Sequence, residues 1–289
     1  CTVTDATARP TGMAALDRKL CGGPREGDLV IPGGRPGAGK SAFGFQIAHT
    51  MACAGWPMLV FSLEMPRGSV LQRVVAQRAG LDLGRIRARA FGSIDETNAY
   101  LKAVHDVRSL PLHIVDDAAI TPAGMRAAAL ALRARVGPLG AVVVDYLQRV
   151  TPDRERESKE QEIASVAKAL KNLARELQCP VIAPAQLKRD LEERGGRFSN
   201  ARKRKKDEDE ERPRMSDFRG SGEIEQEADI LLALHRPRKA SDTREAWVLK
   251  QRNGPADVKV DLLWEKGPAR FVEAPAQLPA PSDESHEDP

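Results

Sequence analysis

The most constraining feature of this sequence is a glycine-rich octapeptide near the start of the chain. Residues 34–41 read GRPGAGKS and match the pattern G-x-x-x-x-G-K-[ST]. The octapeptide follows an apolar run, Leu29–Pro32, and precedes a helical pattern at Ala42–Ala54. Glycines allow successive backbone N–H groups to turn inward and approach a bound anion. A strand, loop and helix of this kind predict an α/β protein that binds the phosphates of a nucleotide.

The residue types in the loop predict what each position does. Lys40 is expected to reach the β- and γ-phosphates, and Ser41 is expected to ligate Mg²⁺. The helix that follows directs its positive end at the anion. The predicted nucleotide-binding residues of this segment are Gly34, Arg35, Pro36, Gly37, Ala38, Gly39, Lys40, Ser41 and Ala42.

Two acids follow apolar strands and supply the remaining chemistry of a phosphoryl-transfer site. Asp145 ends the run Ala141–Val144, and Glu64 comes shortly after Met58–Phe61. Both are expected at the carboxyl edge of a parallel sheet, where ligands of open α/β folds bind. Asp145 is therefore a predicted nucleotide and Mg²⁺ contact, and Glu64 is a predicted base for the attacking water. Taken alone, Asp145 could also cap a turn and Glu64 could simply be solvated.

The apolar runs alternate with helical patterns, which predicts a mainly parallel twisted sheet flanked by helices. An amphipathic helix is expected over Ser158–Gln178 and ends before Pro180. Toward the end of the chain, strict alternation over 258–264 predicts an antiparallel hairpin whose turn is Asn253–Pro255. The expected strands are Leu29–Pro32, Met58–Phe61, Leu112–Val115, Ala141–Val144, Val181–Ala183, Ile230–Leu234 and Ala246–Leu249.

Composition excludes some classes of protein and favours others. No apolar stretch approaches the roughly 20 residues of a membrane span. The four cysteines show no C-x-x-C pair, which fits a reduced cytoplasmic protein without a disulfide framework. The net charge is +4, and residues 1–272 carry 45 basic against 36 acidic residues. A basic body is compatible with a polyanionic partner.

Three segments are expected to lie outside the main fold. Residues 1–10 look like the remnant of an arm or linker, which leaves residues 11–272 as the nucleotide-binding domain. Residues 195–214 hold a basic block and an acidic block with almost nothing apolar, and are interpreted as a mobile insertion. Residues 273–289 contain Pro, Ala, Ser and acids, and predict a disordered acidic tail.

Several strings in this order resemble the successive motifs of DnaB-type replicative DNA helicases across about residues 10–272. They are FSLEMP at 61–66, DYLQ at 145–148, QL at 186–187, MSD at 215–217, SGEIEQEAD at 221–229 and KQRNGP at 250–255. The resemblance implies a RecA-like P-loop motor domain that uses ATP and Mg²⁺. It also implies a homohexameric ring that moves 5′ to 3′ on single-stranded DNA, unwinds duplex during replication, and works with a primase and a helicase loader.

The resemblance assigns further site residues. Gln186 corresponds to the glutamine that senses the γ-phosphate, and Lys250 and Arg252 to fingers that reach the nucleotide of the neighbouring subunit. The two cations flank Gln251 on what is expected to be the last parallel-type strand, so both are expected on one face. Arg219, Gly220 and Gly222 resemble the loop that holds the DNA backbone. The catalytic set is thus Glu64, Lys40, Gln186, Lys250 and Arg252.

The sequence also departs from the family, and other interpretations stay open. Gly220 stands where the family commonly has an acid, and Ala185 where it has a serine. The helical collar domain of the family is not among these residues, so the expected ring is weakened. A RecA-type recombinase or signalling ATPase is one alternative, although it would lack the string at 250–255. A non-motor protein that loads helicases under nucleotide control is the other.

Overall fold

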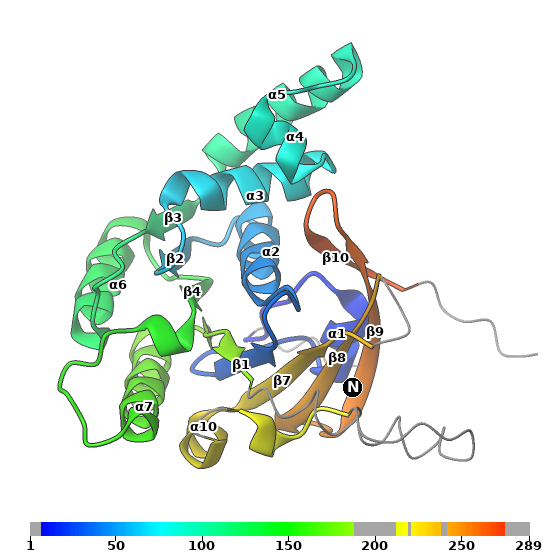
Figure 1. Cartoon of the computed structure of the whole chain (residues 1–289). Helices are drawn as coiled ribbons and strands as arrows, with labels where there is room; N and C mark the ends of the chain where they lie inside the picture. The colour runs from blue at the N-terminus through cyan, green and yellow to red at the C-terminus, as the bar shows by residue number, and fades with distance from the viewer. Residues whose placement is uncertain (1–6, 188–211, 219–220, 238–241, 275–289) are drawn as a thin grey trace, which may run out of the picture.

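The apolar runs of the sequence pair into one mixed sheet at the centre of the molecule (Figure 1). The computed structural model describes residues 7–187, 212–218, 221–237 and 242–274. The strand order is β10-β9-β8-β7-β1-β5-β4-β2-β3, and β6 pairs with the end of β1. The strands are β1 (Leu29–Gly34), β2 (Met58–Ser62), β3 (Leu112–Val115), β4 (Ala141–Asp145), β5 (Val181–Ile182), β6 (Ala185–Gln186), β7 (Ile230–His235), β8 (Thr243–Gln251), β9 (Val258–Glu265) and β10 (Arg270–Glu273).

The sheet has a parallel part and an antiparallel part. Strands β3, β2, β4, β5, β1 and β7 pair in parallel, which confirms the predicted fold class. The expected hairpin is present as β8 and β9, but β10 adds a third antiparallel strand that the sequence did not predict. Strand β8 also starts at Thr243 and ends at Gln251, so it is much longer than the expected run at 246–249. Half-buried polar residues alternate with buried ones along this strand, so its sequence does not form one continuous apolar run.

Alternate residues of each central strand enter different cores. Ile31 and Val144 belong to the apolar cluster on one face, while Val30 and Val143 belong to the cluster on the other. This follows from the two-residue period of a strand whose two faces are both covered. Burial on both faces explains why these strands appear in the sequence as uninterrupted apolar runs.

Helices cover both faces of the sheet (Figure 1). One face packs against α6, α7 and α10, and the other against α1 and α2. The amphipathic helix is confirmed, because α7 begins after Ser158 as its N-cap and ends before Gln178. The α-helices are α1 (Ala14–Lys19), α2 (Lys40–Cys53), α3 (Arg67–Ala79), α4 (Leu83–Ala88), α5 (Ile94–Ser109), α6 (Pro122–Val136), α7 (Lys159–Leu177) and α10 (Ser221–Glu227).

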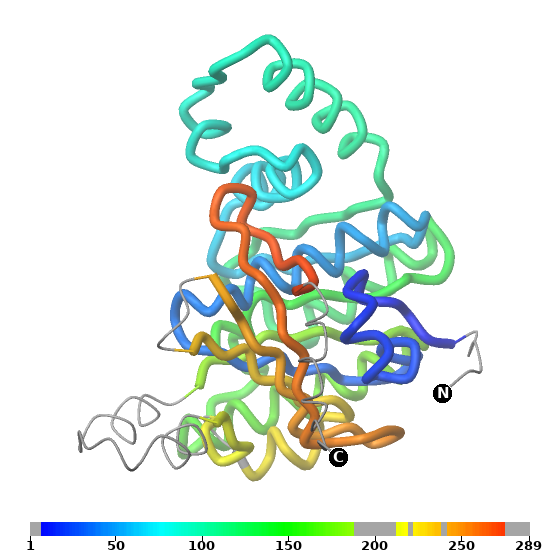
Figure 2. The backbone as a smooth tube through the Cα atoms, turned by 90° about the vertical axis from the view of Figure 1, so that its right-hand side faces the viewer, coloured from blue at the N-terminus to red at the C-terminus, as the bar shows by residue number. Residues whose placement is uncertain are grey.

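Helices α4 and α5 project from the body above α3, as both views show (Figures 1 and 2). They share with α3 a small apolar cluster of their own, which contains Val74, Ile86 and Val107. Ile94 and Leu101 on α5 remain exposed, at 71% and 57%. The sequence did not predict this projection, because the apolar faces of α4 and α5 resemble those of any core helix but pack against α3, with Leu112 of β3 beside them.

The described residues bear only partly on the predicted outer segments. Arg9 of the expected arm is buried, with its guanidinium 4.2 Å from the centroid of the Trp56 ring. Strand β10 ends at Glu273, the first residue of the expected tail. Most of the predicted insertion 195–214, most of the tail, and residues Arg219 and Gly220 lie outside the described residues. Among the described helices, none has the length and apolar character needed to cross a membrane.

Candidate active site and finger pair

The glycine-rich loop connects the end of β1 to the start of α2. Gly37 and Gly39 have φ values of 77° and 92°, a region that favours glycine. A Cβ at Gly39 would also lie 2.7 Å from the Phe271 ring, so no larger residue fits there. No side chain caps the N-terminus of α2, and its first turn holds no acid. The helix therefore presents free N–H groups and the positive end of its dipole to an anion.

Lys40 lies folded back over this loop. Its Nζ donates a hydrogen bond to the Arg35 carbonyl oxygen at 3.0 Å. Burial lowers the pKa of Lys40, while the charges of Asp145 and Glu64 act to raise it. The ammonium group is thus held beside the loop by a neutral carbonyl, which an incoming phosphate can replace as a stronger, charge-assisted partner.

Ser41 and Asp145 meet at the carboxyl edge of the sheet. The Ser41 hydroxyl donates to Asp145 Oδ1 at 2.9 Å, and the other oxygen, Oδ2, is buried without a hydrogen-bond partner. Asp145 is only 1% exposed, and this burial raises its pKa to about 6. The hydrogen bond from Ser41 acts in the opposite direction and lowers that pKa. A buried carboxylate oxygen without a partner is costly unless a ligand satisfies it.

These oxygens fit a magnesium ion. Mg²⁺ prefers oxygen ligands and is commonly bound by one or two protein groups together with phosphates and water. Ser41 offers a hydroxyl, and Asp145 offers a carboxylate with an unsatisfied oxygen. The donor set therefore has the chemistry expected for the cation that accompanies a nucleotide.

Glu64 lies close to both of these groups yet faces solvent. It follows β2 through Leu63, whose N–H donates to the Asp145 carbonyl at 3.0 Å. The Glu64 side chain is exposed, and its charge contributes to the pKa shifts of Lys40 and Asp145. A carboxylate with access to water at this edge has the chemistry of a general base.

Gln186 lies beside the first glycine of the loop. Strand β6 pairs with β1 so that Gln186 is opposite Gly34, and the Gln186 N–H donates to Gln148 Oε1 at 3.1 Å. The next residue, Leu187, forms an antiparallel bridge with Phe218. The backbone that carries Gln186 is thus connected by one residue to the segment that leads to Arg219.

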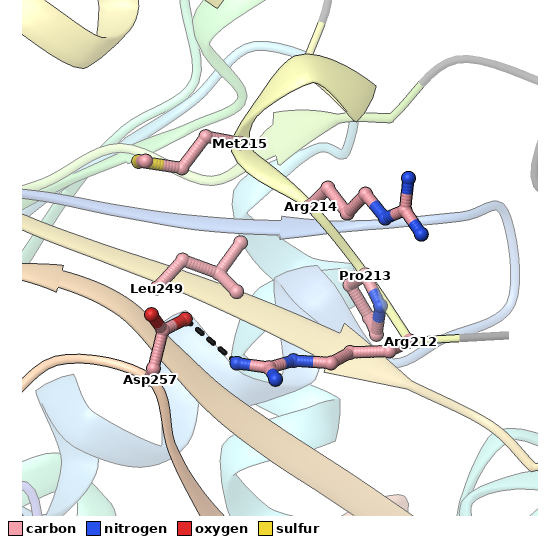
Figure 3. A pocket seen from close by; sticks show the side chains of 6 residues that line it. All are labelled: Arg212, Pro213, Arg214, Met215, Leu249 and Asp257. Carbon is pink, nitrogen blue, oxygen red and sulfur yellow. Dashed lines mark hydrogen bonds and ion pairs between the residues drawn. The ribbon is translucent and has the colours of Figure 1, made fainter. Parts of the chain in front are cut away.

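Residues 212–218 are anchored at both ends. Phe218 packs so closely on β1 that a Cβ at Gly33 would lie 2.3 Å from its ring. At the other end, Arg212 forms an ion pair with Asp257 at 2.7 Å and lies 4.7 Å from the centroid of the Trp247 ring. Figure 3 shows this pair at a cavity of about 460 Å³, which Pro213, Arg214, Met215 and Leu249 also line. The predicted DNA-contact residues follow this anchored segment, and Gly222 is exposed in α10.

The structure does not bring Lys250 and Arg252 to the loop of the same chain. Lys250 is in β8, which is antiparallel to β7, and Gln251 is opposite Ile230 at the start of β7. Because β7 and β1 run in parallel, this is the edge at which β1 begins and not the edge at which the loop follows it. The six-residue length of β1 alone separates the edges by about 16 Å at a parallel strand's rise. Lys250 and Arg252, the predicted finger pair, therefore lie at the opposite edge of the sheet from the glycine-rich loop. We call these the finger edge and the loop edge.

The side chains of both predicted fingers, Lys250 and Arg252, contact α10. Lys250 Nζ donates to the Glu225 carbonyl oxygen, and Arg252 Nη2 donates to the Gln226 carbonyl oxygen at 3.5 Å. The expectation of a parallel-type strand is wrong, because β8 is antiparallel to both of its neighbours. Lys250 lies in β8, and Arg252 comes directly after Gln251, its last residue. Carbonyls at a helix C-terminus attract cations, which holds the pair in place on this surface.

Arg73 is a site residue that the sequence analysis missed. It lies on α3, is half-buried, and its Nε is buried without a hydrogen-bond partner. Burial lowers the pKa of Arg73, whereas the charges of Glu64 and Asp145 raise it. A guanidinium near this edge can pair with carboxylates and can bind phosphate. The sequence signals Arg73 only by its position, nine residues after Glu64 and in the helix α3 that follows the FSLEMP segment.

Together, the parallel sheet, the phosphate loop and the acids at the strand ends define a nucleotide-binding protein with a RecA-like fold. A solved structure described as an ATPase domain has a TM-score of 0.84 and 28% identity, with 95% of this chain and 94% of that chain covered. The RadB recombinase shares the fold at a TM-score of 0.56 and 16% identity, covering 92% of this chain and 100% of that one.

The family model of the DnaB-like helicase C-terminal domain matches residues 9–273, and the chain belongs to this family. The replicative DNA helicase DnaB of Haemophilus influenzae is 35% identical over 86% of this chain and 52% of its own length. The DnaB protein of Geobacillus stearothermophilus is 34% identical over 93% of this chain and 57% of its own length. The chain thus spans about half the length of these relatives.

Proposed function

We propose that this chain is the motor domain of a DNA helicase that hydrolyses ATP between subunits of a ring. The observation that carries the proposal is the separation of the loop from the finger pair at opposite edges of one sheet. One chain cannot close its own site around the γ-phosphate with these cations, whereas a neighbouring copy can supply them. The DnaB relatives support replication as the setting in which the motor unwinds duplex DNA.

The catalytic half of the site lies within one chain. Lys40 and the loop N–H groups bind the phosphates of ATP, Ser41 and Asp145 hold Mg²⁺, and Glu64 accepts the proton of the attacking water. Bound Mg²⁺ neutralises the charge that develops on the phosphate oxygens. Arg252 and Lys250 of the adjacent subunit stabilise the same charge from the other side. Arginine fingers of this kind contribute roughly 10³–10⁵ in rate where they have been measured in GTPases.

The experiment that tests this proposal mixes two inactive variants. Lys40→Ala removes the loop cation and Arg252→Ala removes the finger, so each alone should hydrolyse ATP slowly. If the finger acts in trans, mixed rings contain interfaces with an intact loop and an intact finger, and activity returns in part. Arg126→Ala, which removes a surface ion pair with Glu176, is the matched control and should retain full activity. Absence of recovery at every mixing ratio would contradict the ring.

The DNA contact is proposed to run along the backbone through Arg219, Gly220 and Gly222. Support comes from the anchoring of residues 212–218 against β1 and from the exposed position of Gly222. A glycine-rich loop brings N–H groups close to phosphates without reading sequence. Arg219→Ala should weaken binding equally for poly-dT and mixed sequences and reduce the slope of log K against log salt by about one. A loss confined to one base composition would argue for base contacts instead.

The assembly and its partners are part of the same proposal. A homohexamer that moves 5′ to 3′ on single-stranded DNA fits the family, as do a primase and a helicase loader as partners. A solved DnaB-like replicative helicase, described together with its interactions with primase, has a TM-score of 0.83 and 26% identity, covering 94% of this chain and 63% of that chain. Electron microscopy of the chain with an ATP analogue and oligo-dT tests the subunit number directly.

A further inference from the structure

Arg252 is tethered to one buried carboxylate at the edge of the sheet. The Arg252 N–H donates to the Asp229 carbonyl oxygen at 2.9 Å, and Arg252 Nε lies 3.4 Å from Asp229 Oδ1. The Asp229 side chain is 4% exposed, whereas that of Arg252 is 48% exposed. The Nε end of the guanidinium is therefore held from inside and Nη2 contacts the Gln226 carbonyl, while about half of the side chain remains exposed to another molecule.

Asp229 is in turn fixed by two other elements. Its second oxygen, Oδ2, accepts a hydrogen bond from the Leu29 N–H at 2.8 Å, at the start of β1. The same oxygen forms a buried ion pair with Lys171 of α7. Lys171 Nζ also donates to the Gly27 carbonyl oxygen at 2.7 Å. One carboxylate thus joins β1, α7 and the residue that follows β8.

The two carboxylate oxygens of Asp229 have different partners, because Oδ2 contacts Lys171 and Oδ1 contacts Arg252. A buried ion pair is a poor way to gain stability, because removal of both charges from water offsets much of their attraction. The Lys171 contact instead holds Oδ2 inward, so Oδ1 is left to face Arg252. A charged acceptor makes a stronger and more directional contact to a guanidinium than a neutral one does.

We propose that Asp229 is a positioning residue for Arg252, aligned by its buried ion pair with Lys171. The inference rests on the proposed function, in which Arg252 completes the site of the neighbouring subunit. Asp229 itself touches no nucleotide and acts only through the finger. A misplaced catalytic group costs up to about 100-fold in rate, so Asp229→Asn should lower ATP turnover by about 10- to 100-fold.

Mixed rings separate this role from a general effect on folding. An Asp229→Asn subunit should fail only as a donor of the finger, because its own loop, Glu64 and Asp145 lie at the opposite edge of the sheet. Mixed with Lys40→Ala subunits, which keep an intact finger, it should recover activity as far as Arg252→Ala does. Mixed with Arg252→Ala subunits it should recover none, and the double variant Asp229→Asn/Arg252→Ala should be no slower than Arg252→Ala.

Two further variants make each outcome decisive. Asp28→Asn is the matched control, because Asp28 is a buried carboxylate at the same sheet edge that accepts from the Arg25 N–H and, within the described part of the chain, forms neither a hydrogen bond nor an ion pair with Arg252. It should retain parental turnover. Asp229→Asn/Lys171→Met removes both buried charges, which is often tolerated in folding, and should reproduce the donor defect if Asp229→Asn unfolds.

Three results overturn the proposal. They are parental turnover of Asp229→Asn, failure of both Asp229 variants to regain activity with Lys40→Ala subunits, and equal loss in Asp28→Asn. Failure of the proposed function gives a different result. In that case Arg252→Ala itself turns over ATP normally, or the mixture of Arg252→Ala with Lys40→Ala recovers nothing.

Discussion

The two edges of the central sheet carry charges that are handled in opposite ways. At the loop edge, Asp145 Oδ2 and Arg73 Nε are buried without partners, so the site is unsatisfied in the isolated chain. At the finger edge, Arg252 is paired with Asp229, and Lys250 with a carbonyl of α10. The first edge therefore gains by binding a charged ligand, whereas the second presents cations that are already held in place. Two copies of one chain can build a shared site if one copy supplies cations that are already held in place and the other supplies a loop edge that still lacks polar partners.

The largest effect is expected at Glu64, which belongs to the loop edge alone. Glu64→Gln should bind ATP normally but lose about 10²–10⁴ in turnover, because the amide cannot accept a proton from water. Fluorescent-nucleotide binding and phosphate release measure the two quantities separately. Ser69→Ala, a change on the surface of α3, serves as the control. Equal turnover of Glu64→Gln and parent would remove Glu64 from the role of base.

The second prediction concerns the effect of the buried Asp145 carboxylate on the stability of the folded chain. The pKa of Asp145 is about 6 in the folded chain against an ordinary 3.8. Between these pH values the folded state holds a proton that the unfolded state has lost. The free energy of unfolding therefore falls as pH rises from 3.8 to about 6, by about 3 kcal/mol for this group.

Asp145→Asn should raise the free energy of unfolding at neutral pH, because the asparagine buries no charge. Without nucleotide at pH 7, the variant should unfold at higher urea concentration than the parent, by up to about 3 kcal/mol in free energy. Near pH 4 the difference should vanish, because the parent carboxyl is then protonated in the folded state. The same variant should lose Mg²⁺-dependent turnover. Equal stability of the two chains at pH 7 would show that the edge is not strained by this buried charge.

A third prediction asks whether Arg73 belongs to the unsatisfied edge. Burial lowers the pKa of Arg73 while the charges of Asp145 and Glu64 act to raise it, and its Nε is buried without a hydrogen-bond partner. Loss of one charge-assisted contact to phosphate or to the base should slow turnover about tenfold in Arg73→Ala. Arg78→Ala, on the same helix, removes only a surface ion pair with Asp106 and is the matched control. If both changes slow turnover equally, the effect of Arg73→Ala comes from a general disturbance of α3 and not from the site.

The sequence predicted the loop edge well and the finger edge only through resemblance. Gly34–Ser41, Glu64 and Asp145 are near strand ends, and parallel pairing brings such ends together whatever the remaining chain does. The finger edge depends on the antiparallel strands β8 to β10. These strands alternate between buried and half-buried residues, and that pattern did not define how long they are or how they pair. Asp229 and Lys171 escaped notice because a buried ion pair needs two distant residues to meet. Arg73 escaped because an arginine on an amphipathic helix is ordinarily solvated.

The smallest effect is expected at Gln186, which lies between the loop and the segment leading to Arg219. Leu187 donates to the Gly34 carbonyl at 3.3 Å and bridges Phe218, so a shift of Gln186 toward phosphate moves the anchored end of that segment. Gln186→Ala should leave ATP binding and basal turnover nearly unchanged while it removes stimulation by single-stranded DNA. The ratio of turnover with and without oligo-dT measures the effect, and Gln161→Ala, on the exposed start of α7, is the control. Normal stimulation in Gln186→Ala would show that DNA binding does not reach the loop through Gln186 and β6.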